Sequence, residues 1–136
     1  MGIYFAIAMG VVGLVFAYIL SCFVGKAEPG TERMKEISAA IHQGAKAFLF
    51  AEYRVLVVFV VVLFLAIGFG LGNWVTAFCF VCGSAASVLA GYCGMNVATK
   101  ANVRTARAAE QKGMVSALAI AFRGGAVMGM CVVGLG

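Results

Sequence analysis

Long apolar stretches dominate the chain, with two charged segments between them. Residues 2–24 and 55–99 carry no charge, and from Met114 to Gly136 the one charged residue is Arg123. A helix needs about 20 consecutive apolar residues to cross a bilayer, whereas strands of a membrane barrel alternate apolar and polar residues over about ten positions. The pattern therefore predicts an all-α membrane protein with about four transmembrane helices.

Residues 55–99 are too many for one span, so we expect a turn at residues 68–73, where Gly and Asn tolerate positive φ. The expected spans lie near residues 2–24, 55–69, 74–97 and 114–136. Trp74 fits an anchor at the membrane interface. The apolar pattern breaks off at Gly136 without a polar flank, so we expect a truncated fourth span.

The charged segments are residues 26–54 and 99–113. Pro29 and Gly30 break the chain before Thr31, a good helix N-cap, so we expect a helix from about Glu32. Its apolar stripe indicates that it lies along the interface or packs on other helices before the second span. All ten Lys and Arg residues lie in or near the two segments. The positive-inside rule therefore predicts that both are cytoplasmic and that the N-terminus is outside.

Composition excludes several chemistries. Only 11% of the 136 residues are charged, there is no Asp, and the five acids are Glu28, Glu32, Glu36, Glu52 and Glu110. Phosphate chemistry with Mg²⁺ needs clustered carboxylates, which this chain does not supply. A nucleotide site is not indicated either, because Gly124-Gly125 is not followed by the Lys-Ser/Thr of a phosphate-binding loop. We predict no catalytic, cofactor-binding or metal-ligating residue in this chain. The net charge of +5 reflects the cytoplasmic segments, so we expect no nucleic-acid partner.

A few polar residues remain as candidates. Lys100, Arg104 and Arg107 share one helical face with Glu110 next along it. That face could receive an anionic substrate or lipid headgroups, or it is a solvated helix end with one intrahelical ion pair. Arg123 lies inside an apolar run, where a lone charge costs a few kcal/mol or more, so we expect it near the headgroups. Without an acid at i+3 or i+4, the only histidine, His42, is interpreted as a surface group rather than a proton relay.

Small residues form stripes that predict close helix packing. They are Gly124, Gly125 and Gly129 in one span, and Gly91, Gly94, Ser84 and Ser87 in another. All five Cys lie in apolar runs, and we expect them to be small buried hydrophobes; they are Cys22, Cys79, Cys82, Cys93 and Cys131. The Cys79-x-x-Cys82 pair has no basic neighbour that would generate a thiolate.

Two runs resemble the membrane-bound, ion-pumping pyrophosphatases. They are GYCGMNVATKANVRTA at residues 91–106 and AFRGGAVMG at residues 121–129. Shorter matches lie in the preceding helix, at Glu36-Ile37, Ala40-Ile41, Gly44-Ala45, Ala47-Phe48-Leu49 and Glu52-Tyr53-Arg54. The resemblance covers nearly the whole chain and is least distinctive in the first span.

The resemblance implies a homodimeric pump of about sixteen transmembrane helices in a bacterial cell membrane or an internal membrane. Such a pump couples hydrolysis of inorganic diphosphate to outward transport of H⁺ or Na⁺. Residues 1–136 would be the N-terminal part of its polytopic membrane domain. Mg²⁺ with pyrophosphate would be bound by residues outside this chain, and K⁺ is a candidate second cofactor. The fragment by itself would be inactive, and its partners would be the rest of its own polypeptide, a second protomer and membrane lipids.

Two other interpretations come from different classes. One is a small non-catalytic helical membrane subunit that acts through helix-helix packing, against which the unfinished fourth span argues. The other is half of a small-solute transporter, but no similarity links the first and second pairs of spans.

Overall fold

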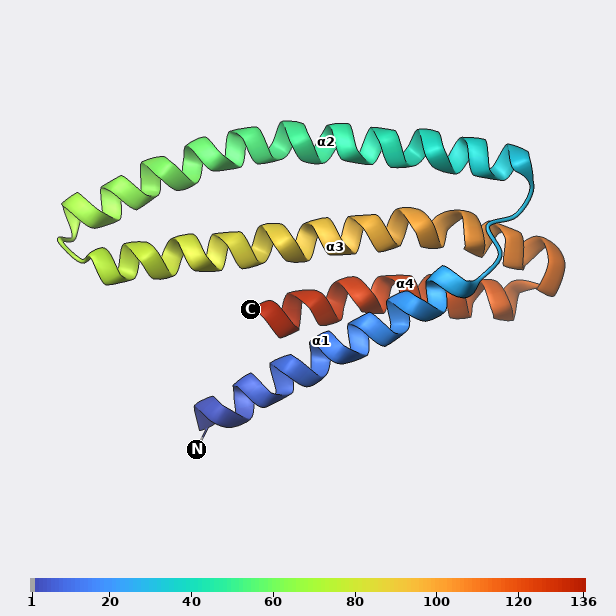
Figure 1. The fold of residues 1–136 in the computed structure, drawn as a ribbon, viewed down its shortest axis with the longest axis horizontal. Coiled ribbons are helices and arrows are strands. Elements are labelled where there is room, and N and C mark those ends of the chain that lie inside the picture. Colours follow the sequence, from blue (N-terminus) through green and yellow to red (C-terminus); the bar gives the residue numbers. More distant parts are fainter. Residues whose placement is uncertain (1) are drawn as a thin grey trace.

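Four long helices make up residues 2–136, the part of the chain that the computed structural model describes (Figure 1). They are α1 (Gly2–Lys26), α2 (Glu32–Leu65), α3 (Trp74–Lys112) and α4 (Met114–Leu135), and a π-helical turn, η1 (Ala66–Gly70), extends α2. Each is long and apolar enough to cross a membrane. The predicted all-α membrane fold with four spanning helices is confirmed.

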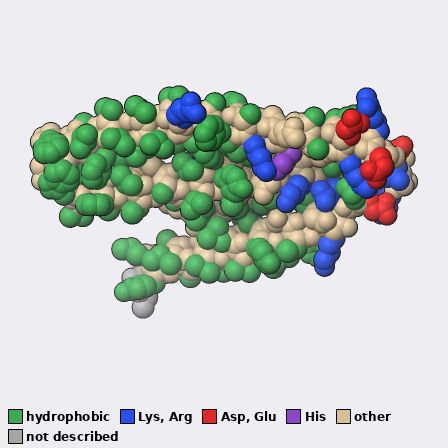
Figure 2. All heavy atoms as spheres, turned by 45° about the horizontal axis from the view of Figure 1, so that its top comes forward, with side chains coloured by type: hydrophobic (Ala, Val, Ile, Leu, Met, Phe, Trp, Pro, Cys, Tyr) green, Lys and Arg blue, Asp and Glu red, His purple; other side chains and the backbone are tan. Residues whose placement is uncertain are grey.

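The helices run up and down, so that alternate connections lie at opposite ends (Figure 1). The α1–α2 and α3–α4 connections share one end, where most Lys, Arg and Glu side chains gather (Figure 2). The η1–α3 turn lies at the other end, and residues 55–99 around it are uncharged. The molecule is therefore polarised along its length, as membrane insertion requires.

The two charged segments are largely helical. Thr31 caps α2 as predicted, its side chain accepting a hydrogen bond from the Met34 amide at 3.4 Å. The helix then continues from Glu32 into the second span without a break. Residues 99–112 are the last turns of α3, and the connection to α4 is Gly113 alone, with φ at +80°. An L side chain rarely adopts that φ, so glycine makes this one-residue reversal feasible.

The turn expected at residues 68–73 is shorter than predicted. Gly68 and Gly70 belong to η1, which leaves residues 71–73 as the break, with Gly72 at φ +65°. Gly68 is buried under the Trp74 ring, where a Cβ would lie 2.8 Å from ring carbon Cζ3. Asn73 caps α3, its side chain accepting from the Thr76 amide at 3.2 Å. Two residues that the sequence analysis assigned to the turn therefore have other roles: Gly68 packs against Trp74, and Asn73 caps α3.

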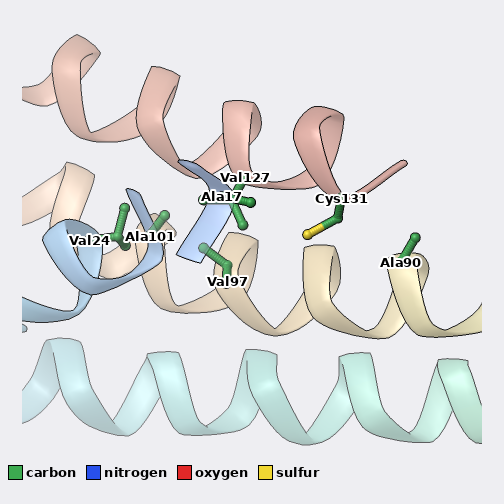
Figure 3. Packing of buried hydrophobic residues seen from close by; sticks show 7 residues of the cluster. All are labelled: Ala17, Val24, Ala90, Val97, Ala101, Val127 and Cys131. Atoms are coloured by element: carbon green, nitrogen blue, oxygen red, sulfur yellow. The ribbon is translucent and has the colours of Figure 1, made fainter. Parts of the chain in front are cut away.

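Helices α1, α3 and α4 form the core. Its buried side chains are small: Ala17, Val24, Ala90, Val97, Ala101, Val127 and Cys131 (Figure 3). Within the described residues, α2 packs against α3 and against neither α1 nor α4, and it buries no residue. A hydrogen bond from the Tyr53 hydroxyl to the Val88 carbonyl, 3.0 Å long, ties α2 to α3. The chain is thus a three-helix unit with α2 on its periphery.

Only some of the predicted small-residue contacts form within this chain. A Cβ on Gly124 would lie 2.7 Å from the Ala101 Cβ, and one on Gly94 would lie 2.6 Å from the Met128 Cγ. Gly125 and Gly129 meet no other residue of the described chain, so their role in packing inside a larger bundle stays a prediction. A close approach that the prediction missed joins α1 to α4, where a Cβ on Gly10 would lie 3.1 Å from the Gly134 carbonyl oxygen.

Most of the cysteines do not lie in the core. All five are free thiols, and Cys131 alone is buried, so the expectation of buried thiols is wrong for the other four. Those four lie on helix surfaces that this chain leaves uncovered, as do large apolar side chains such as Phe5, Val115 and Phe122. Apolar surface of this extent is stable against lipid or against other apolar helices.

Gly124→Ala tests the α3–α4 contact, because the new methyl group overlaps the Ala101 side chain. Overpacking of this kind costs about 1–3 kcal/mol, so we expect a lower melting temperature in detergent. Gly125→Ala is the matched control, since it adds the same atom on the next residue in open space. Helix propensity predicts that it is neutral or stabilising by up to about 1 kcal/mol. Equal melting temperatures for the two variants would contradict this packing.

Candidate functional site

The charged end of the molecule holds most of the polar contacts between helices. Arg104, on α3, reaches across to the C-terminal end of α1. Its Nε donates to the Ala27 carbonyl at 2.9 Å, and one terminal nitrogen donates to the Gly25 carbonyl at 3.4 Å. The other terminal nitrogen donates to the Lys100 carbonyl of its own helix at 2.9 Å. The guanidinium fork therefore joins two helices without any acidic partner.

The position of Arg104 matches the electrostatics of a helix end. The last carbonyls of a helix have no intrahelical partner and carry partial negative charge. A cation that donates to them satisfies their hydrogen-bonding capacity and the helix dipole together. Arg104 thus acts as a C-terminal cap for α1 supplied by a different helix.

The other two members of the predicted basic face have separate roles. Arg107 donates to the Glu110 carboxylate at 2.8 Å, which is the intrahelical ion pair expected for a helix end. Lys100 is exposed and lines a shallow cavity between α2 and α3, together with His42 and Thr99. Among the three, Arg104 alone makes a hydrogen bond to another helix. The three residues therefore do not form a single binding group.

Arg123 has no carboxylate partner among residues 2–136. Its guanidinium lies over the Phe23 ring of α1, 5.5 Å from the centroid. Such a contact stabilises a cation without an acid. It also adds a polar link between α4 and α1 at the charged end.

His42 is half-buried and contacts α3, so it is not a freely exposed surface group as interpreted from the sequence. Its Nδ1 lies 3.1 Å from the Thr99 hydroxyl, which is itself within 2.9 Å of the Met95 carbonyl. Because the single hydroxyl hydrogen is directed to a carbonyl of α3, Nδ1 is assigned as the donor to Thr99. Thr99 is 8% exposed. This pair fixes α2 to α3, and no local sequence signal links residues 57 positions apart.

Metal chemistry has no site among the described residues. No three His, Cys, Asp or Glu side chains in residues 2–136 come together as metal ligands. Glu32 and Glu36 are committed to exposed ion pairs with Lys35 and Arg33. The carboxylates present here therefore do not fit a Mg²⁺ site.

Comparison with known proteins gives one consistent family. The family profile described as inorganic H+ pyrophosphatase matches residues 11–136. A putative K(+)-stimulated pyrophosphate-energized sodium pump of Clostridium tetani is 53% identical over 128 residues, covering 94% of this chain. A K(+)-insensitive pyrophosphate-energized proton pump of Pyrobaculum aerophilum is 41% identical over 133 residues, covering 91% of this chain. A pump of the same description from Methanosarcina mazei is 43% identical over 127 residues, covering 93% of this chain.

These relatives are much longer proteins. The chain covers 19% of the Clostridium tetani relative and 18% of the Pyrobaculum aerophilum relative. It thus spans about a fifth of the length of the curated relatives that it matches.

Arg104→Lys tests the link between α1 and α3. Lysine keeps the charge but lacks the planar fork that reaches carbonyls in three directions, so we expect a loss of about 1–3 kcal/mol of stability from the interhelical hydrogen bonds. Thermal unfolding in detergent measures the loss. Arg33→Lys is the control, because the Arg33 side chain is 78% exposed and its partner Glu36 lies on its own helix. Equal stability of the two variants would argue against the cap.

Proposed function

The chain belongs to the inorganic H+ pyrophosphatase family, and on that basis we propose that it is part of a membrane pump. The complete protein hydrolyses inorganic diphosphate and uses the free energy to transport H⁺ or Na⁺ across the membrane. The observation that carries the proposal is the match of nearly the whole chain to relatives named as pyrophosphate-energized pumps. Four membrane-spanning helices in the described residues agree with a place in such a pump.

For the transported ion the alternatives are H⁺ and Na⁺, and for activation they are dependence on K⁺ and independence from it. The relatives are named sodium pumps in some cases and proton pumps in others, and K(+)-stimulated or K(+)-insensitive. We therefore propose K⁺ as a candidate activator. Mg²⁺ with pyrophosphate would be held by residues outside this chain, because the carboxylates of residues 2–136 do not fit a Mg²⁺ site.

The proposed contribution of this chain is a rigid frame at the periphery of the pump. Substrate-driven closure does mechanical work only if the surrounding helices do not yield. The contact of α1, α3 and α4 through small side chains supports such a role, as does the Arg104 cap at the charged end. The frame would pack against the rest of its own polypeptide within a homodimer.

The first experiment is a transport assay on the complete reading frame expressed in inverted membrane vesicles. We expect Mg²⁺-dependent hydrolysis of pyrophosphate together with accumulation of H⁺ or Na⁺ in the vesicle lumen. Parallel assays with and without Na⁺ and K⁺ identify the transported and the activating ion. Residues 1–136 expressed alone serve as the control and should hydrolyse no pyrophosphate. Hydrolysis without ion accumulation by the complete protein would argue against the pump.

The proposed orientation has the N-terminus outside and the charged end in the cytoplasm. Labelling with a membrane-impermeant maleimide tests it in a background with the five native Cys changed to Ser. Leu71, 74% exposed at the uncharged turn, is changed to Cys, and Ala109, exposed near the end of α3, is changed in a second variant. We expect Leu71→Cys to react in intact cells and Ala109→Cys to react only in inverted vesicles. The reverse pattern would rule out this orientation.

A further inference from the structure

A cavity of about 300 Å³ opens at the charged end between α3, α4 and the connection from α1 to α2. Its charged lining consists of four cations and one carboxylate, a formal excess of three positive charges: Arg104, Arg107, Lys112, Arg123 and Glu28. The walls between the charges are small residues such as Ala108, Ser116 and Ala119. The cavity therefore combines a concentrated positive charge with room for a ligand.

The positive charge in the cavity is poorly compensated. Among the described residues, neither Lys112 nor Arg123 forms an ion pair, and Glu28 forms none either. Arg107 uses one terminal nitrogen for Glu110, while its Nε is buried without a hydrogen-bond partner. A buried N–H group without an acceptor costs about 1–3 kcal/mol. An oxyanion in the cavity would supply the missing negative charge and accept hydrogen bonds from the cationic groups that line it.

The surroundings of the cavity distinguish between kinds of anion. On the outer face of α4, roughly 90–150° around the helix from the residues that line the cavity, lie Val115, Leu118 and Phe122, which are 83%, 61% and 79% exposed. They recur at i, i+3 and i+7, so they form one apolar stripe on a helix that spans the membrane. A basic pocket between helices at the charged end of a membrane protein suits the phosphate head of an anionic lipid, and the apolar outer face of α4 suits its hydrocarbon tail.

From these features we infer that the cavity binds the phosphate group of an anionic phospholipid, with the acyl chains extending along the outside of α4. Arg107 and Arg123 supply charged donors, Lys112 adds a third cation, and Glu28 opposes binding. Arg104 contributes charge while its hydrogen bonds remain on α1 and α3. The inference does not depend on pump activity, because it rests on this cavity and its neighbouring helix face.

Native mass spectrometry of the complete protein in detergent tests the inference without pyrophosphate. The probes are dioctanoyl phosphatidylglycerol, dioctanoyl phosphatidylcholine and inorganic phosphate. We expect the anionic lipid to bind more tightly than the zwitterionic one. Each cation near a headgroup is worth roughly a fivefold change in affinity. The Lys112→Gln/Arg123→Gln double variant should therefore bind phosphatidylglycerol more than tenfold more weakly, whereas the exposed control Arg33→Gln should not change.

Glu28→Gln provides a test that misfolding cannot imitate. Removing the one carboxylate in the lining should tighten phosphatidylglycerol binding by roughly fivefold. Unchanged affinity in both Glu28→Gln and the double variant would overturn the inference. Equal binding of the two lipids would overturn it too. Saturation by inorganic phosphate alone, with the same dependence on these variants, would overturn the assignment to a lipid and identify free phosphate as the ligand.

Discussion

Close contact between small side chains of α1, α3 and α4 is the constraint on which the rest of the structure depends. Lipid tails are as apolar as leucine, so helices in a membrane gain little from burying large side chains and associate where their backbones approach closely. The core here is accordingly built from Ala, Val, Gly and Cys, and its close approaches include Gly124 against Ala101 and Gly10 against Gly134. Larger residues at these points would separate the three helices.

Polar contacts add direction to this packing. Van der Waals contact between smooth helices fixes distance better than it fixes rotation or register. Hydrogen bonds between named atoms fix both: Arg104 to the end of α1, His42 to Thr99, and Tyr53 to the Val88 carbonyl. The last two attach α2, which contributes no buried residue of its own. The peripheral helix is therefore held mainly by α3.

Charge is concentrated at one end of the molecule, where it also contributes to contacts between helices. Cations gather there, which is the basis of the proposed cytoplasmic orientation, and they have different roles in the structure. Arg104 caps a helix and Arg107 forms an ion pair, while Lys112 and Arg123 line a cavity and have no acidic partner within residues 2–136. These cations thus concentrate positive charge between α3, α4 and the connection from α1 to α2.

The number and type of the helices, the Thr31 cap and the ion pair of Arg107 followed from the sequence, because continuous apolar runs, cap chemistry and i,i+3 spacing are local properties. The resemblance of residues 91–129 to a known family, which the comparisons confirm, was also visible in the sequence. Which glycines meet another helix, Gly124 rather than Gly125, was decided by the tertiary structure, since adjacent residues on a helix point about 100° apart and either can face a neighbour. The partners of His42 and Arg104 were decided there as well. Thr99 is 57 residues from His42 along the chain, and Ala27 is 77 residues from Arg104. Only the packing of the helices brings the members of each pair together.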